Sequence, residues 1–194
     1  MTRLLVATTN AGKQREFRRL LAHLPADVVT PEDIGLKLEV DEPYDTYAEN
    51  ATAKADAFAR ASGLLTLADD SGIEVAALGW GPGVHSARWV AGGNNAERLL
   101  EALGDAEDRR ARMVCALALA IPGGSPIEIF SDEVIGEVAR EPRGDGGFGY
   151  DPIFLLPDGR TTAELAQEQK DRVSHRGRAV AAATPRLVEL LARG

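Results

Sequence analysis

The sequence predicts an α/β protein with a mixed central sheet, and three observations lead to this prediction. Arg3–Thr8 and Leu64–Ala68 are short and mostly apolar, which is typical of strands buried on both faces. Between them, apolar side chains at helical spacing over Phe17–Leu24 predict a helix. Residues 112–121 and 127–138 are strand-like and are joined by a turn rich in Pro and Gly, so we expect an antiparallel pair in the same sheet.

The composition is that of an ordinary soluble globular protein. The chain has 194 residues, of which 44% are hydrophobic and 27% charged, and we expect one domain over residues 1–194 without a linker. No apolar run approaches the roughly 20 residues of a membrane span, and the chain starts in a strand-like pattern instead of a secretory signal. Cys115 is the single cysteine, so an internal disulfide is excluded and a cytoplasmic location is expected.

The charge of the chain excludes one class of function. A formal net charge of -8 argues against a protein that coats nucleic acid, which needs a large basic surface. The net charge does not exclude a protein that binds a small anionic ligand in a local basic pocket. Of the 22 basic residues four are lysines, Lys13, Lys37, Lys54 and Lys170. A compact ammonium group suits phosphate oxygens, although codon usage would give the same count.

Two adjacent carboxylates, Asp69 and Asp70, follow the apolar run of Leu64–Ala68. We expect the strand to end over Asp69–Gly72, because open α/β sheets place their chemistry at strand ends. Side chains alternate along a strand, so the two acids should face opposite ways and serve different roles. Two acids beside a buried strand need a positive partner, and Mg²⁺ meets that need. The alternative interpretation is a polar turn.

The segment Thr9–Lys13 joins the first strand to the first helix. Free backbone N–H groups and the helix dipole favour an anion at such a position, and Lys13 would add a full positive charge. The pattern is not the P-loop, because Gln14 follows Lys13 where that motif has Ser or Thr. The alternative is that Thr9 or Asn10 only caps the helix.

Thr46 and Glu49 form a capping box, which predicts a helix over residues 47–62 that Gly63 ends. Lys54 lies on the more apolar side of this helix, so its ammonium group must reach a partner or an open pocket. The acidic stretch before the helix, residues 39–45, either supplies a carboxylate to a metal or is a solvated loop.

Residues 144–149 contain the pattern G-x-G-x-x-G, but we reject a dinucleotide site. Tyr150–Leu156 reads as a strand, and no helix can begin there. Phe148 and Tyr150 instead offer an aromatic edge on a glycine-lined backbone, which suits a flat ligand. The alternative places both rings in the core.

The loop of residues 80–89, with a Trp at each end, serves either a subunit interface or its own packing.

The last part of the chain brings further basic side chains to predicted helix starts. Thr161 and Glu164 predict a capped helix through about Asp171, and this helix carries Lys170. Residues 174–178 add basic groups at the start of the final helical segment. Pro185 is expected to break or restart that segment, because a Pro in a helix interior costs about 3 kcal/mol.

Together these segments resemble the inosine triphosphate pyrophosphatase family. The matching stretches keep their order and spacing from one end of the chain to the other: Thr8–Lys13, Glu49–Ala51 with Lys54, Ala68–Gly72, Pro82–Gly83 with Ser86–Arg88, Gly146–Pro152 and Ser174–Gly177. The resemblance implies a Mg²⁺-dependent hydrolase that converts noncanonical purine nucleoside triphosphates (ITP, dITP, XTP) to the monophosphate and pyrophosphate. It also implies an elongated mixed central β-sheet flanked by helices, an active-site cleft between two lobes, and a homodimer.

The resemblance implies roles for individual residues as well. Residues implied to hold the triphosphate are Thr8, Thr9, Asn10, Ala11, Gly12, Lys13 and Lys54. Glu42 and Asp70 are implied as Mg²⁺ ligands, with Asp41 as the alternative to Glu42. Asp70 is also the implied base for the attacking water. Ser71 is implied to contact the substrate, and residues implied to contact its purine are Phe148, Gly149, Tyr150, Asp151, Lys170, His175 and Arg176. The last three match residues that read the six-position oxygen of the purine. This chain has Thr9 where the family usually has Gly.

Two rival functions share parts of this pattern. A pyrophosphatase for modified pyrimidine nucleotides would have the same sheet architecture, and it would release product from dTTP analogues instead of dITP. A nucleotide sensor would keep the basic and aromatic groups but would bind without turnover. The intact carboxylate pair at Asp70 favours an enzyme over a sensor.

Overall fold

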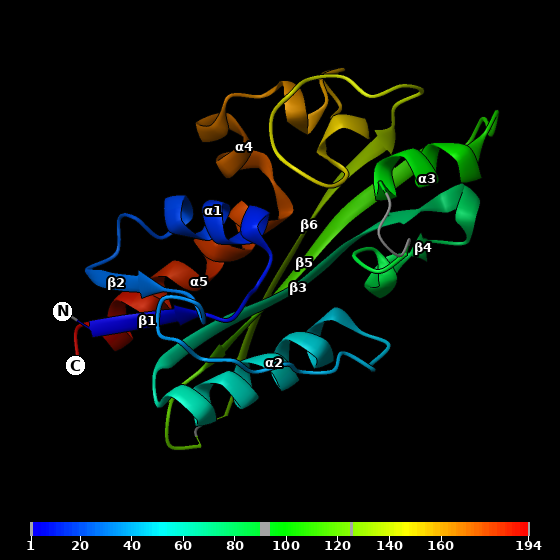
Figure 1. The fold of residues 1–194 in the computed structure, drawn as a ribbon. Helices are drawn as coiled ribbons and strands as arrows, with labels where there is room; N and C mark the ends of the chain where they lie inside the picture. The colour runs from blue at the N-terminus through cyan, green and yellow to red at the C-terminus, as the bar shows by residue number, and fades with distance from the viewer. Residues whose placement is uncertain (1, 90–93, 125, 194) are drawn as a thin grey trace. The chain divides into compact units, whose positions relative to one another are not determined.

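The computed structural model describes residues 2–89, 94–124 and 126–193, and it shows the predicted α/β protein (Figure 1). Strands and α-helices follow one another in this order: β1 (Thr2–Val6), α1 (Ala11–Leu20), β2 (Ala26–Val29), α2 (Tyr47–Ser62), β3 (Leu65–Val75), β4 (Gly81–Pro82), α3 (Asn95–Leu103), β5 (Arg110–Ala120), β6 (Glu128–Val138), β7 (Phe154–Leu155), α4 (Gln167–Val173) and α5 (His175–Leu191). Short 3₁₀ turns occur at Ala76–Leu78, Gly83–His85, Asp151–Ile153 and Thr162–Glu164.

The strands form the expected mixed sheet in the order β2-β1-β3-β5-β6-β7, with β4 paired to β3. β1 pairs in parallel with β2 and with β3, whereas β4 on β3 and β7 on β6 are antiparallel. β5 and β6 are neighbours, in agreement with the strand pair predicted for residues 112–121 and 127–138. The fold class predicted from the sequence is therefore confirmed.

The chain divides into two compact units. The first unit comprises Met1–Asp70, Cys115–Ser131 and Ala179–Gly194, and the second comprises Ser71–Val114 and Asp132–Arg178. β3, β5 and β6 each contribute residues to both units, and β3 passes from one to the other after Asp70. The single domain and the cleft between two lobes stay predictions.

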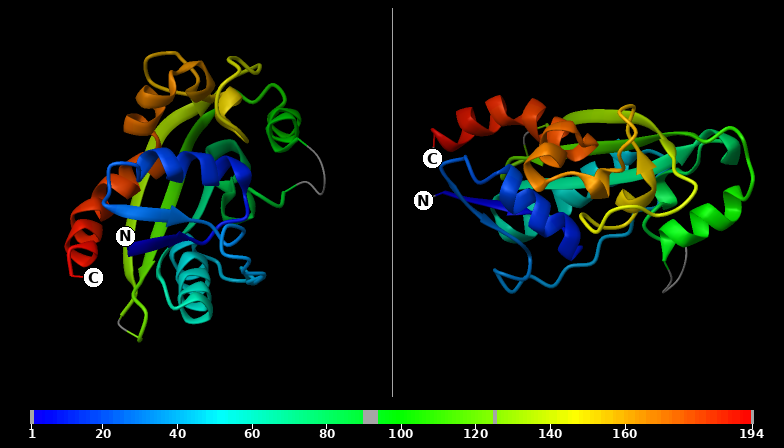
Figure 2. Two further views of the ribbon diagram at one scale, coloured as in Figure 1. Left: turned by 60° about the vertical axis from the view of Figure 1, so that its left-hand side comes forward. Right: turned by 90° about the horizontal axis from the view of Figure 1, so that it is seen from above.

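In the first unit, helices cover both faces of the strands, with α1 and α5 on one face and α2 on the other (Figures 1 and 2). Leu67 of β3 belongs to the apolar cluster that includes Phe17 of α1 and Leu187 of α5. The next residue, Ala68, belongs to the cluster formed with Phe58 of α2. This alternation continues along the strand, so Asp69 follows Leu67 toward α1 and Asp70 follows Ala68 toward α2.

The second unit has its own apolar core, to which β3, α3, β5, β6 and β7 contribute. Arg109 lies buried at its edge and donates from Nε to the Val138 carbonyl at 2.7 Å and from Nη2 to the Ala139 carbonyl at 2.9 Å. Its Nη1 donates to the carbonyl of Gly104 at 3.2 Å. This cation joins the start of β5 to the end of β6 through carbonyl oxygens, which satisfy its donors.

Local signals set several helix ends where the sequence predicts them. Thr46 caps α2 by accepting a hydrogen bond from the Glu49 N–H at 3.2 Å, and Gly63 ends the helix with φ at 67°. Asn94 caps α3 in the same way. The bounds of α2 are those expected from its capping box and terminal Gly.

Four local predictions are wrong. β3 does not end at Asp69 but continues to Val75, because groups from α1 and α2 meet its two buried carboxylates. The predicted strand over Tyr150–Leu156 is largely a 3₁₀ turn, with β7 limited to two residues. The helix predicted from Thr161 is interrupted: a 3₁₀ turn comes first, and α4 begins at Gln167.

The fourth wrong prediction concerns Pro185, which lies inside α5 without ending it. Ala183, Leu187 and Leu191 are buried on one side of this helix. Their burial in the first unit's core outweighs the cost of a Pro in the helix interior.

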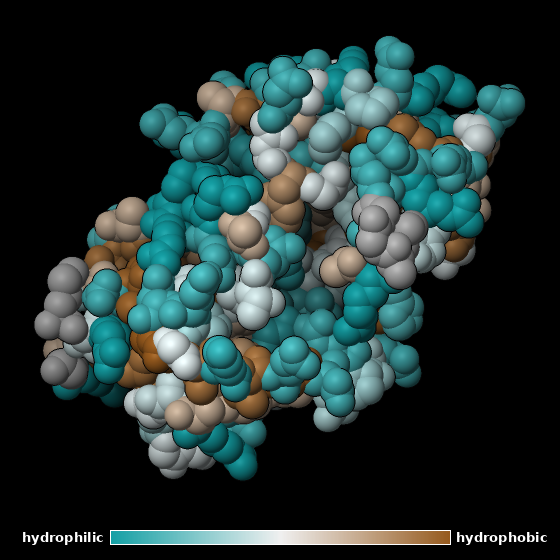
Figure 3. All heavy atoms as spheres, viewed as in Figure 1, coloured by the Kyte–Doolittle hydropathy of each residue, from teal (hydrophilic) through white to brown (hydrophobic). Residues whose placement is uncertain are grey.

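Hydrophilic side chains cover most of the molecular face shown in Figure 3. Among the described residues, none of the helices combines the length and the apolar character that crossing a membrane requires.

Candidate functional site

Predicted site residues, together with neighbours to which the sequence assigns no site role, form two groups, one in each unit. The first group, here called the carboxylate cluster, lies in the first unit and consists of Lys13, Glu42, Asn50, Lys54, Asp69 and Asp70. The second group, here called the aromatic cluster, lies in the second unit and consists of Ser71, Phe148, Asp151, Thr162, Lys170 and Arg176.

In the carboxylate cluster, each of the two adjacent aspartates contacts a different helix. Asp69 Oδ2 lies 2.9 Å from Lys13 Nζ at the start of α1. Asp70 Oδ2 accepts a hydrogen bond from Asn50 Nδ2 of α2 at 3.1 Å. Asp69 and Asp70 are both buried. The expectation that the two acids face opposite ways and have different partners is therefore confirmed.

Lys54 of α2 joins the cluster from the apolar side of its helix. Its ammonium group forms an ion pair with Glu42, and it donates to the backbone carbonyl of Asp69 at 3.0 Å. Asp41, the alternative to Glu42, is exposed, whereas Glu42 is half-buried. The structure thus places Glu42 with Lys54, and it gives the unexplained lysine of the sequence two partners.

Charges around Asp70 act in both directions on its pKa. Burial is the largest effect and raises the pKa of Asp70, and the like charge of Glu42 raises it further. Lys13, the hydrogen bond from Asn50 and Lys54 lower it, but the net direction is upward. The charged form of Asp70 is therefore less favourable in the folded protein than in water.

The turn before α1 is organised by its own polar groups. Asn10 Oδ1 accepts from the Lys13 N–H at 3.0 Å, so the helix-cap interpretation is confirmed for Asn10. The buried Thr8 accepts from the Asn10 N–H at 3.2 Å through its hydroxyl oxygen. Thr9 is exposed and lines a pocket of about 630 Å³ together with Gln14. The anion-binding role of this turn stays a prediction.

The carboxylate cluster offers two carboxylates, Glu42 and Asp70, to a divalent cation. Within the described residues, no three His, Cys, Asp or Glu side chains form a group able to hold a metal. Mg²⁺ is commonly bound by one or two carboxylates together with waters and phosphate oxygens, and Glu42 and Asp70 supply two. Burial and the negative charge of Glu42 disfavour the charged form of Asp70. A bound cation would favour that charged form.

In the aromatic cluster, a buried ion pair supports a half-buried ring. Lys170 Nζ lies 2.5 Å from Asp151 Oδ2, and both side chains are less than a tenth exposed. The Lys170 ammonium lies 5.3 Å from the centre of the Phe148 ring, and the Arg176 guanidinium lies 5.7 Å from it. Arg176 also donates to Ser71 Oγ at 2.9 Å. Two cations thus lie within cation–π distance of the Phe148 ring.

Asp151 organises this cluster through both carboxylate oxygens. Oδ2 accepts from the Phe148 N–H at 2.7 Å, and Oδ1 accepts from the Thr162 hydroxyl at 2.8 Å. Gly147 has a φ of 73°, and a side chain there would bring Cβ to 2.1 Å from Asp151 Oδ2. Only glycine lets the loop carry Phe148 so close to this carboxylate.

The two predicted aromatic residues have different environments. Tyr150 is 7% exposed, belongs to the core of the second unit and donates its hydroxyl to the Ser86 carbonyl at 2.8 Å. Burial raises the pKa of Tyr150. Phe148 is half-buried. The core interpretation therefore holds for Tyr150, and Phe148 is the ring more accessible to a flat ligand.

His175 and Arg176 lie at the first turn of α5, where both are buried. Ser174 precedes them, and its Oγ accepts from the Gly177 N–H at 3.1 Å. This hydrogen bond fixes the first turn of α5 and with it the place of Arg176. The predicted roles of His175, Gly149 and the other substrate-contacting residues stay predictions.

Sequence reasoning did not assign a role to two residues of these clusters. Asn50 precedes Lys54 by four positions, so the two side chains share one face of α2, and this spacing was a usable signal. Thr162 lies in a 3₁₀ turn, and no local pattern connects it with Asp151, which is eleven residues earlier.

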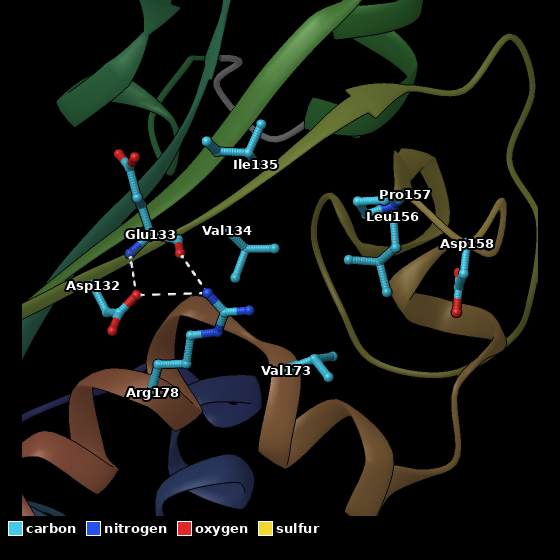
Figure 4. A pocket seen from close by; sticks show the side chains of 9 residues that line it. All are labelled: Asp132, Glu133, Val134, Ile135, Leu156, Pro157, Asp158, Val173 and Arg178. Carbon is cyan, nitrogen blue, oxygen red and sulfur yellow. Dashed lines mark hydrogen bonds and ion pairs between the residues drawn. The ribbon is translucent and has the colours of Figure 1, made fainter.

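The second unit has a further pocket away from these residues. It measures about 620 Å³ and is lined by nine residues of β6, the segment after β7, α4 and α5 (Figure 4). Arg178 borders it and donates to the carbonyl of Glu133 at 3.2 Å. None of the lining residues is among the predicted site residues.

The fold and the two clusters define an α/β protein that places carboxylates and lysines together in one unit and cations around an aromatic ring in the other. The chain belongs to the Ham1 family, whose sequence profile matches residues 4–186.

Similar proteins cover almost the whole chain. A dITP/XTP pyrophosphatase of Symbiobacterium thermophilum is 49% identical over 99% of this chain and 98% of its own length. The dITP/XTP pyrophosphatase of Nitrosomonas europaea is 48% identical over 98% of this chain and 95% of its own.

Solved structures agree with these sequence matches. A HAM1 protein from Coxiella burnetii has a TM-score of 0.85 and 38% identity, covering 97% of this chain and 100% of that chain. A nucleoside-triphosphatase described as dITP/XTP pyrophosphatase from Mycobacterium abscessus has a TM-score of 0.72 and 43% identity, covering 95% and 100%. The expected fold is therefore confirmed by known structures.

Proposed function

We propose that this chain is a Mg²⁺-dependent nucleoside triphosphate pyrophosphatase that hydrolyses ITP, dITP and XTP to the nucleoside monophosphate and pyrophosphate. Membership of the Ham1 family and relatives described as dITP/XTP pyrophosphatases support this substrate class. The observation that carries the proposal is the buried Asp70, beside Glu42 and under the influence of Lys13 and Lys54.

The carboxylate cluster binds the triphosphate in this proposal. Lys13, Lys54 and the turn Thr8–Gly12 supply positive charge and backbone N–H groups for phosphate oxygens. Mg²⁺, when bound by Glu42 and Asp70 together with the phosphates, would neutralise negative charge that builds up during the reaction. Lys54, which contacts Glu42 and the Asp69 carbonyl, adds its positive charge to this cluster.

Asp70 is the proposed base. Release of pyrophosphate requires that water attack the α-phosphorus, forming one P–O bond while the bond to the β-phosphate oxygen breaks. Asp70 accepts the proton that the water loses, and the leaving electron pair stays on the pyrophosphate. In the metal-free protein, burial raises the pKa of the Asp70 carboxyl.

The aromatic cluster selects the purine base of the nucleotide in this proposal. The Phe148 ring stacks on the purine, while Lys170 and Arg176 donate to its six-position oxygen. Adenine has an amino group at that position, so a buried donor would lose its hydrogen bond. A 6-oxo purine is therefore favoured over adenine.

A panel of nucleoside triphosphates tests this function. ITP, dITP, XTP, ATP, GTP and dTTP are incubated with Mg²⁺, and released pyrophosphate is measured separately from phosphate. We expect pyrophosphate from the first three substrates, and a loss of about 10²–10⁴-fold in Asp70→Asn.

Other outcomes of this panel favour the rival functions. Turnover of dTTP analogues without dITP turnover would indicate a pyrimidine-nucleotide pyrophosphatase. Binding without turnover would indicate a sensor, and full activity in Asp70→Asn would contradict the assignment of Asp70 as the base.

We further propose a homodimer that acts in the cytoplasm. The second unit exposes Ile135 and Trp80 on a face where Arg112 contacts Glu74 and Glu133 in ion pairs. Arg112 also lies 5.4 Å from the Trp80 ring centre. An apolar surface with paired charges suits contact with a second copy. Sedimentation of wild type and Ile135→Glu tests this, with a monomer expected for the variant only.

A further inference from the structure

Asn50 connects the two carboxylates that the proposed function assigns to the metal. Its side chain is 0% exposed and lies in the first turn of α2. Oδ1 accepts from the Tyr44 N–H at 3.1 Å, and Nδ2 donates to the Tyr44 carbonyl at 3.1 Å and to Asp70 Oδ2 at 3.1 Å. One amide group therefore contacts both the acidic loop before α2 and the carboxylate on β3.

Tyr44 belongs to the same loop as Glu42, two residues further along the chain. Residues 36–44 have no regular secondary structure, and the Tyr44 side chain is 45% exposed, so apolar burial of this residue contributes little to holding the loop. The loop is tied to α2 at two points one helical turn apart: Asn50 holds the Tyr44 backbone, and Lys54 forms an ion pair with Glu42.

The chemistry of these contacts requires an asparagine. The side chain uses one acceptor and two donors at the same time, which a carboxylate, a hydroxyl or an apolar group of similar size does not provide. A glutamine has the same groups, but its extra methylene moves them relative to the helix. Removal of the amide leaves both backbone groups of Tyr44 without these partners.

We propose that Asn50 is a positioning residue that sets Glu42 relative to Asp70 and so prepares the two carboxylates for a divalent cation. This inference rests on the proposed function, because that function assigns the two carboxylates as metal ligands. Asn50 itself contacts neither metal nor substrate; it acts through the loop backbone and through Asp70.

The first test is hydrogen exchange in the metal-free protein without nucleotide. Asn50→Ala is the main variant, because Ala favours helix formation and leaves α2 intact. We expect the Tyr44 amide to exchange at least about tenfold faster than in wild type, with the amides of β3 unchanged. An unchanged exchange rate at Tyr44 overturns the proposal.

The second test is the Mg²⁺ dependence of pyrophosphate release from dITP. Groups that orient metal ligands typically change metal affinity by about 10–100-fold, so we expect Asn50→Ala to raise the half-saturating Mg²⁺ concentration by that factor. Saturating Mg²⁺ should restore most of kcat, and KM for the nucleotide should then change little. A half-saturating concentration within about twofold of wild type overturns the proposal.

Two further variants separate positioning from a loss of stability. Thr46→Ala removes the α2 cap, and it should lower stability without shifting the Mg²⁺ dependence. The same Mg²⁺ shift in Thr46→Ala contradicts the proposal. Asn50→Leu fills the space of the amide without its hydrogen bonds and should behave like Asn50→Ala. Loss of cooperative unfolding in both Asn50 variants assigns Asn50 to fold stability and also overturns the proposal.

Failure of this inference can be distinguished from failure of the proposed function. The exchange measurement needs neither substrate nor activity. If the wild-type protein releases no pyrophosphate, the proposed function is contradicted. If an active Asn50→Ala protein has an unchanged Tyr44 exchange rate, only the positioning role of Asn50 is contradicted.

Discussion

The carboxylate cluster and the aromatic cluster both hold charges away from water, but the net charge of their named side chains differs in sign. The first combines three carboxylates (Glu42, Asp69 and Asp70) with two lysines, and the second combines one carboxylate with the cations Lys170 and Arg176. The side chains of Lys13, Lys54 and Glu42 are 14%, 15% and 22% exposed, whereas those of Lys170 and Asp151 are 7% and 4% exposed.

The carboxylate cluster is therefore suited to bind a charged ligand, whereas the ion pair of the aromatic cluster stabilises the local structure. The carboxylate cluster is partly open and has a negative excess, so a cation and its attached phosphates can complete it. The aromatic cluster is nearly closed and has a positive excess, so it offers donors to an oxygen atom while its ion pair fixes the loop. Four predictions test this difference between the clusters.

The largest effect is expected for Asp151→Ala. The change leaves the buried Lys170 without its carboxylate and removes the acceptor for Phe148 and Thr162. Breaking a buried ion pair from one side typically costs about 3–5 kcal/mol, and urea denaturation should show that loss. The exposed pair of Arg60 and Asp56 provides the control.

In that control, Asp56→Ala should lower the unfolding free energy by less than about 1 kcal/mol, because the pair is solvated. Equal losses in Asp151→Ala and Asp56→Ala would show that the Lys170 pair is not the closed, shape-holding contact described above.

The second prediction compares the two acids of the loop before α2. Glu42→Gln should raise the half-saturating Mg²⁺ concentration for pyrophosphate release by about 10–100-fold, because it removes a proposed ligand. Asp41→Asn removes the neighbouring, exposed carboxylate and should leave that concentration nearly unchanged. The reverse result would assign the ligand to Asp41.

The third prediction separates the two aromatic residues. Phe148→Leu should remove about 0.5–1.5 kcal/mol of stacking with the purine, which is roughly a 2- to 12-fold rise in KM for dITP. Tyr150→Phe loses the hydrogen bond to Ser86 and should lower stability while leaving KM unchanged. A KM change in Tyr150→Phe alone would transfer the base-contacting role to Tyr150.

The smallest effect concerns the pH dependence of stability in the metal-free protein. Because burial and then Glu42 raise the pKa of Asp70, its protonated form stabilises the folded chain. That stability is fully present below the unfolded pKa of about 3.9 and is lost as pH rises through the folded pKa. Asp70→Asn should therefore gain stability relative to wild type as pH rises from about 4 to 7, measured by urea denaturation.

Asp33 provides a control of opposite sign. Hydrogen bonds from the Thr30 N–H at 2.7 Å and from its hydroxyl at 2.9 Å lower the pKa of Asp33. Its ionised form stabilises the folded chain above the unfolded pKa, and this contribution is lost as pH falls through the folded pKa. Asp33→Asn should lose stability relative to wild type as pH rises. Parallel pH curves for the two variants would refute the assigned directions.

Much of the local structure could be predicted because its signals lie within a few residues. The capping box of Thr46 and Glu49 and the terminal Gly63 defined α2 from end to end. Alternation along β3 predicted that Asp69 and Asp70 have different partners, as observed. The order of short motifs indicated the family, to which the profile match over residues 4–186 assigns the chain.

The amino-acid sequence was enough to predict the fold class, the helix ends with strong caps and several residues of the candidate clusters, but not Asn50 or Thr162, since such predictions depend on side-chain type and short spacings. The folded structure was needed to show that β3 continues past Asp70, that α5 passes through Pro185 and that Tyr150 joins a core. The physical reason is that burying a charge or a helix break depends on partners far along the chain. Asn50 reaches Asp70 across 20 positions, and Arg176 reaches Ser71 across 105.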